Sequence, residues 1–218
     1  MKNNKINTTA LAIAMSLVAG TALAQPNVTQ TRDVSGFDVV KSLGSSDVEI
    51  KVGDAFKVEV SADERIISRI LTEVNNGVLT ISRERSERGN RGNFNRNAKV
   101  LITMPSIKAF KGRGSGDGYI TDISAAQFNV ELSGSGDLFL SGTCTNGEFK
   151  SRGSGDLEAK DFSCDNVEVR SQGSGDMDIG ANLTVSLNLN GSGDVDIYGE
   201  ARITSMRTRG SGDVSQIK

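Results

Sequence analysis

The sequence predicts an all-β protein built as a parallel β-helix, a solenoid whose coils are about 19 residues long. Three observations lead to this fold class. The tetrapeptide Gly-Ser-Gly-Asp occurs six times, with its aspartates 20, 19, 20, 18 and 19 residues apart. Short runs of alternating apolar and polar residues follow the motif, which is typical of strands with one buried face. The repeat-bearing half contains no stretch of ten residues with helical periodicity.

The repeated motif marks one corner of each coil. Its copies are Gly114–Asp117, Gly134–Asp137, Gly153–Asp156, Gly173–Asp176, Gly191–Asp194 and Gly210–Asp213, and a degenerate copy, Gly44–Asp47, lies upstream. A single coil cannot bury its inward face, so each coil must stack on neighbours about 4.8 Å away. The two glycines favour a sharp corner with positive φ, and each aspartate is expected to cap its own turn.

Residues at equal distances from the motif are expected to stack in columns. Four positions before it all residues are apolar: Val130, Phe149, Val169, Leu187 and Met206. Nine positions before it the residues are small: Ala125, Cys144, Cys164, Asn182 and Ala201. Cys144 and Cys164 should therefore lie on neighbouring coils. Their spacing and an exported location permit a disulfide, but two buried thiols would also fill this column, and both states stay open.

Residues 25–110 predict a less regular, β-rich part that continues into the repeat coils of residues 111–218, so residues 25–218 are expected to form one domain. Strands are expected at residues 37–40, 48–52, 56–60, 78–81 and 100–104. Asp63 is expected to N-cap a helix of one or two turns that carries Ile66, Ile67, Ile70 and Leu71.

Two connections in this part have distinct signals. The run Asn75-Asn76-Gly77 predicts a turn. The segment Arg83–Arg96, with a local net charge of +3, is expected to be a solvated hairpin loop between the strands at 78–82 and 98–104. Binding of this segment to an anionic surface is the less favoured interpretation.

The first 24 residues predict a signal peptide that directs export. Lys2 and Lys5 form a basic start, residues 10–19 are apolar, and Ala22–Ala24 is a cleavage site of the small-x-small type. The apolar run is too short to span a bilayer, and no later stretch approaches ~18 apolar residues, so no transmembrane segment is expected. The mature protein would begin at Gln25 and reside in the periplasm, at the cell surface or outside the cell.

Composition excludes several classes of function. The sequence contains no His, which rules out a Ser-His-Asp hydrolase, a His-ligated zinc site and a haem His ligand. Removal of Lys2 and Lys5 leaves 23 basic and 27 acidic residues, a net charge of −4. Without a chain-wide basic field, nucleic acid is not an expected partner. No catalytic residue or resident cofactor is identified.

The order of motifs from Gly36 to Asp213 resembles the GIN domain family, also called the putative auto-transporter adhesin head domain. The resemblance is carried by the strand at Phe37 leading to Gly44–Val48, by Asn75–Ile81, by Val100–Pro105 and by the repeated motif that follows. It implies a right-handed β-helix at the cell surface or in the periplasm.

The repeated aspartates have two interpretations. The residues concerned are Asp117, Asp137, Asp156, Asp176, Asp194 and Asp213. At a spacing of about 4.8 Å, each like-charge pair in water would cost on the order of 1 kcal/mol. Calcium could relieve this repulsion, but calcium-binding β-helix repeats have a nine-residue period. We therefore favour a structural role, with cation binding as the alternative.

The sequence is most consistent with an exported, non-enzymatic β-helix. Its expected function is that of a scaffold or adhesion-type binding module for a protein or glycan partner at the envelope or outside the cell. A carbohydrate-active β-helix enzyme and a periplasmic cation-binding repeat protein are the alternatives. An enzyme would need paired carboxylates and aromatic platforms that break the repeat, and the only tyrosines are Tyr119 and Tyr198. After Asp213 only Val214–Lys218 remain, so open strand edges predict a homo-oligomer through the C-terminal coil.

Overall fold

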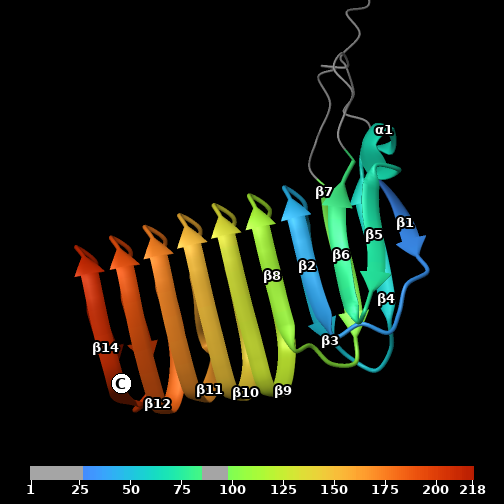
Figure 1. Ribbon diagram of the computed structural model, residues 1–218. Coiled ribbons are helices and arrows are strands. Elements are labelled where there is room, and N and C mark those ends of the chain that lie inside the picture. The colour runs from blue at the N-terminus through green and yellow to red at the C-terminus, as the bar shows by residue number, and fades with distance from the viewer. Residues whose placement is uncertain (1–26, 85–97) are drawn as a thin grey trace, which may run out of the picture.

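The computed structural model describes residues 27–84 and 98–218, and in these residues the chain is a flattened β-solenoid (Figure 1). Strands take up 73% of the described residues and helix only 2%, which confirms the all-β prediction. The predicted signal peptide and residues 85–96 of the Arg-rich segment lie outside the described residues.

Fifteen strands and one helical turn are present in the described residues. They are β1 (Val28–Arg32), β2 (Val39–Gly44), β3 (Asp47–Val52), β4 (Lys57–Ala62), α1 (Glu64–Ile67), β5 (Ile70–Asn75), β6 (Val78–Arg83), β7 (Ala98–Met104), β8 (Ala109–Gly114), β9 (Gly118–Gly134), β10 (Leu138–Gly153), β11 (Leu157–Gly173), β12 (Met177–Gly191), β13 (Val195–Tyr198), β14 (Arg202–Gly210) and β15 (Val214–Ile217).

The strands line two opposite faces of the solenoid. The motif face has the order β1-β4-β7-β3, followed by the first residues of β9 to β12 and then by β13 and β15. The other face, called the long-strand face here, runs β5-β6-β2-β8, then through the later residues of β9 to β12 to β14. Strands β9 to β12 each bend and contribute to both faces, which is why they reach 15 to 17 residues.

The Gly-Ser-Gly-Asp corners form one edge of the solenoid, the upper edge of Figure 1. Consecutive corners are in parallel register, as shown by the pairs Gly114–Gly134 and Gly153–Gly173. Gly44 pairs with Gly114 in the same way, so the degenerate copy is the first corner of this row. The irregular part and the repeat coils thus share one row of corners.

The core is a set of apolar columns between the two faces. Val130, Phe149, Val169 and Leu187 pair in the predicted register and are at most 1% exposed. Fully buried Phe128 and Phe162 place their ring centroids 5.4 Å apart, and Phe162 lies 6.2 Å from Phe149.

The small-residue column needs one correction. Cys144 pairs with Ala125 and with Cys164 as predicted, but Cys164 then pairs with Ala181 rather than with Asn182. The register shifts between Cys164 and Asn166, which moves the following residue of β12 out of the column. Asn182 is exposed, and its Oδ1 accepts a hydrogen bond from the Ser163 hydroxyl at 2.9 Å.

The predicted helix begins after Asp63 as expected and is one turn long, but Ile70 and Leu71 are not part of it. Asp63 is the N-cap of α1, and its carboxylate accepts a hydrogen bond from the Arg65 amide at 3.0 Å. The Arg65 guanidinium also holds the pKa of Asp63 down to about 2. Ile70 and Leu71 lie in β5 instead, because this segment pairs antiparallel with β6 across a tight turn at Asn76 and Gly77, both with positive φ.

The predicted hairpin between β6 and β7 is also wrong. Strand β6 has β5 on one edge and β2 on the other, while β7 has β4 and β3. Both edges of each strand are thus occupied, and the two cannot pair with each other. Strand β6 is parallel to β2 and β7 is parallel to β3, so β6 and β7 form the two sides of a further coil.

Candidate binding surfaces

The aspartates of the motif form a hydrogen-bonded column along the corner edge. In each step, one carboxylate oxygen accepts a hydrogen bond from the backbone amide of the aspartate in the next coil. Asp137 Oδ1 accepts from the Asp156 amide at 2.9 Å, and Asp156 Oδ1 accepts from the Asp176 amide at 2.8 Å. The complete column is Asp47, Asp117, Asp137, Asp156, Asp176, Asp194 and Asp213. Each aspartate therefore caps the following turn and not, as expected, its own.

This arrangement bears on the cation-binding alternative. One oxygen of each carboxylate up to Asp194 is engaged by a backbone amide. Within residues 27–84 and 98–218, no group of three or more His, Cys, Asp or Glu side chains is placed to hold a metal ion. Calcium binding by Asp117, Asp137, Asp156, Asp176, Asp194 and Asp213 stays an untested alternative.

Both glycines of the motif are required by the close stacking of the corners, since a Cβ on Gly134 would lie 2.0 Å from the carbonyl oxygen of Gly114, and the first glycine is required by its backbone conformation as well. Gly134 has φ +134°, in the region that L residues rarely adopt. Gly136 does not have a positive φ, contrary to the prediction for both glycines. A Cβ on Gly136 would lie only 2.2 Å from the carbonyl oxygen of Gly116 in the preceding coil. The second glycine thus lets consecutive corners stack at strand distance.

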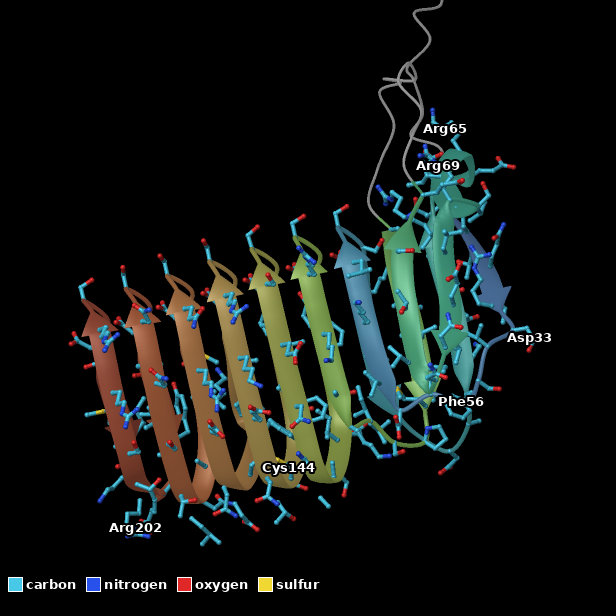
Figure 2. The ribbon with its side chains drawn as sticks, in the orientation of Figure 1. Asp33, Phe56, Arg65, Arg69, Cys144 and Arg202 are labelled. Carbon is cyan, nitrogen blue, oxygen red and sulfur yellow. A yellow bond between two sulfur atoms is a disulfide. The ribbon has the colours of Figure 1, made fainter. Side chains whose placement is uncertain are left out.

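Cys144 and Cys164 lie on adjacent coils at the edge opposite the Asp column (Figure 2). Their sulfur atoms are joined in a disulfide, with the two Cα atoms 4.4 Å apart. The exposed fraction is 7% for Cys144 and 0% for Cys164. The bond links β10 to β11 inside the core and is a structural crosslink.

Outward-pointing charges are segregated between the two faces. The motif face carries the Asp column and, two residues further along each coil, Glu158, Asp178 and Asp196 in one register column. Burial, and then the nearby charge of Asp196, raise the pKa of Asp178. The long-strand face of the same coils is mainly basic.

A groove lies on the long-strand face near the C-terminal end of the solenoid. We call it the Arg207 groove; it has a volume of about 690 Å³ and lies over β11, β12 and β14. Its lining residues are Arg170, Ser171, Gln172, Asn188, Asn190, Met206, Arg207, Thr208 and Arg209. Sequence reasoning missed this groove. Its signal is present one and three positions before the motif, where the last coil has Arg209 and Arg207.

A second groove, of about 350 Å³, crosses β4, β7, β3 and β9 on the motif face. Tyr119 lines it, and the Tyr119 ring stacks on Phe139 with the centroids 4.7 Å apart. Burial, followed by the charge of Asp117, raises the pKa of Tyr119. The groove also contains Glu59, whose carboxylate pairs with Lys57 at 2.8 Å, and Glu49, which pairs with Lys99 at 2.5 Å.

The fold is a β-solenoid with grooved outer faces and with columns of side chains in fixed relative positions. The chain belongs to the family described as putative auto-transporter adhesin, head GIN domain, which matches residues 36–201.

One solved structure shares this fold, and a second is less similar. A putative adhesin from Bacteroides fragilis is similar with a TM-score of 0.73 and 21% identity, covering 89% of this chain and 98% of that chain. A putative lipid binding protein from Parabacteroides distasonis has a TM-score of 0.49 and 24% identity, covering 88% and 97%. The family and the Bacteroides fragilis protein are both described as putative adhesins. No match was found among curated proteins.

Proposed function

We propose that the protein is an exported, non-enzymatic β-helix that acts as an adhesion-type binding module or scaffold at the cell envelope. The observation that carries this proposal is that the residues which stack the coils differ from the residues which form the outer surface. The repeated glycines and aspartates stack the coils, while the outward residues of the strands are free to vary from coil to coil. A surface of this kind offers many side chains in fixed relative positions, which suits recognition of an extended partner.

The groove at Tyr119 supports binding more than catalysis. Its carboxylates Glu49 and Glu59 lie on β3 and β4, with Leu101 of β7 between them in register. Each carboxylate forms an ion pair with a lysine. Both carboxylates are therefore engaged by lysine side chains of the same sheet and are not free to contact a substrate without breaking these pairs.

The envelope location rests on two supports. Residues 1–24 have the pattern of a signal peptide, and the family is described as an adhesin head. In the part of the chain that the structure describes, no helix is long and apolar enough to cross a membrane.

The proposal is tested with residues 25–218, which contain every described residue. The immobilised protein is presented to a glycan array and to detergent-solubilised envelope proteins, with the heat-unfolded protein as control. We expect saturable, competable binding to at least one glycan or protein class. Absence of saturable binding to every class, or release of new reducing ends from a bound polysaccharide, would overturn the proposal.

A further inference from the structure

The Arg207 groove has two walls and a floor that the strand register defines. Arg170 of β11 pairs with Asn188 of β12, which pairs with Arg207 of β14. Two residues further along, Gln172, Asn190 and Arg209 align in the same way. Two strand spacings separate the walls by about 9.6 Å at the backbone, and the shorter asparagines lie between them. The groove is therefore an open trough with long basic side chains on both sides.

The guanidinium groups in this trough are not equally engaged. Arg170 pairs with Glu168 on its own strand, with N–O distances of 2.9 Å from Nε and 2.5 Å from the terminal nitrogen. The guanidinium groups of Arg207 and Arg209 form no ion pair or hydrogen bond with any residue that the structure describes. Both side chains are exposed. They are free to bind a ligand without first breaking an internal contact.

The surrounding surface has a basic excess. On the outer side of β10 to β14, the basic side chains of the long-strand face are Lys150, Arg152, Arg170, Arg202, Arg207 and Arg209. The acidic ones are Glu148 and Glu168, which pair with Lys150 and Arg170. Figure 2 shows Arg202 at the lower edge of the solenoid, where β14 begins. The chain as a whole has a negative net charge, but this face has a positive one.

The lining residues indicate the chemistry of the ligand. Guanidinium groups present several N–H donors and bind carboxylate, sulfate and phosphate groups with two parallel hydrogen bonds. The side-chain amides of Gln172, Asn188 and Asn190 both donate and accept, as recognition of hydroxyl groups requires. None of the groove's lining residues is aromatic, so it lacks the stacking platform by which proteins hold single-stranded nucleic acid.

We propose that the Arg207 groove binds an anionic polysaccharide, with Arg207 and Arg209 contacting its acidic groups and the amides contacting its hydroxyls. This inference rests on the proposed binding function and adds the site and the ligand class. A polymer fits better than a single anion because Arg152 lies in the same register row as Arg209, three strand spacings away, with the amides of Gln172 and Asn190 between them, so a chain could contact both arginines.

The test is titration of residues 25–218 with polygalacturonate and with heparin, with neutral dextran as the uncharged control. We expect saturable binding of at least one of the two polyanions, weakening as salt is added, and none of dextran. The double variant Arg207→Glu/Arg209→Glu should lower the affinity at least tenfold. The matched control Lys111→Glu/Arg113→Glu changes the same two columns on β8 and should stay within twofold. Arg113, Arg207 and Arg209 are exposed, whereas Lys111 is half-buried and pairs with Glu131 at 3.3 Å, so melting temperatures of both double variants are measured to verify the fold.

Three results would overturn this inference. The first is no binding of either polyanion at low salt. The second is equal loss in both double variants, which would indicate nonspecific charge attraction. The third is tighter binding of polyglutamate or single-stranded DNA than of either polysaccharide, which would assign another occupant. If any of these holds while the glycan array or envelope proteins still give saturable binding, the proposed function survives and only the Arg207 groove assignment fails.

Discussion

The two ends of the solenoid differ in how far they cover the apolar core. At the end formed by β1, β4 and β5, antiparallel strands cover the last parallel coil, and Val58 and Val60 of β4 are fully buried. At the other end, β14 and β15 carry Ile203, Met206 and Ile217, which are 37%, 53% and 40% exposed. An inward-pointing residue is thus buried by the strands of the neighbouring coil and not by its own coil.

The column that contains Phe149 and Met206 shows this difference in burial most clearly. Phe149 has a coil on each side and is fully buried, whereas the outer edge of β14 has no partner strand in the described part of the chain. The self-association expected through the C-terminal coil would cover this edge, and it stays a prediction.

The largest expected effect compares two members of that column. Phe149→Ala should lower the free energy of unfolding by about 4 kcal/mol, because it removes a fully buried ring that packs near Phe162. Met206→Ala, at the exposed end, should change it by less than about 0.5 kcal/mol. Urea unfolding followed by circular dichroism measures both. Equal losses would mean that Met206 is covered in solution.

The next effect concerns corner stacking. Gly155→Ala should cost about 3 kcal/mol, because the added Cβ would lie 2.1 Å from the carbonyl oxygen of Gly136 and the coils would have to separate. The control is Ser154→Ala in the same turn, where the side chain is exposed and little should change. A Gly155→Ala protein as stable as the control would show that corners are not closely stacked.

The disulfide tests how far stacking depends on a covalent link. Replacing Cys144 and Cys164 together by alanine should cost about 3 kcal/mol through the entropy of the unlinked unfolded chain. Alanine already occupies the neighbouring positions Ala125 and Ala181, so no new packing is introduced. Reductant should destabilise the natural protein and leave the double variant unchanged. Peptide mapping that finds only free thiols or intermolecular bridges would contradict the bond.

The smallest effect concerns the Asp column. Asp156→Ala should cost about 1 kcal/mol, since the Asp176 amide loses its acceptor. Asp156→Asn retains an acceptor oxygen and should cost less than about 0.5 kcal/mol. Asp213→Ala is the matched control, because no described amide donates to its carboxylate. A saturable rise in melting temperature with calcium, lost in Asp156→Asn, would instead favour cation binding.

The comparison between regions also explains which predictions succeeded. In the repeat coils, an equal spacing fixes which residues are neighbours, so the pairing of Phe149 with Val169 and of Cys144 with Cys164 could be predicted. In the irregular part no spacing relates the segments. The sequence pattern therefore indicated a strand at β6 but did not reveal that β2 and β5 occupy its two edges.

The sequence alone determined the period, the register of the apolar column that contains Phe149, the corner glycines and the adjacency of the two cysteines. These properties follow from a chain that returns to the same point every 19 or so residues. The tertiary structure alone decided which amide each aspartate caps, which face is basic, and that Arg207 and Arg209 face Arg170 and Gln172 across the asparagines of β12. These properties depend on contacts between different coils and on the direction in which each strand presents its side chains, and the order of residues within one coil specifies neither.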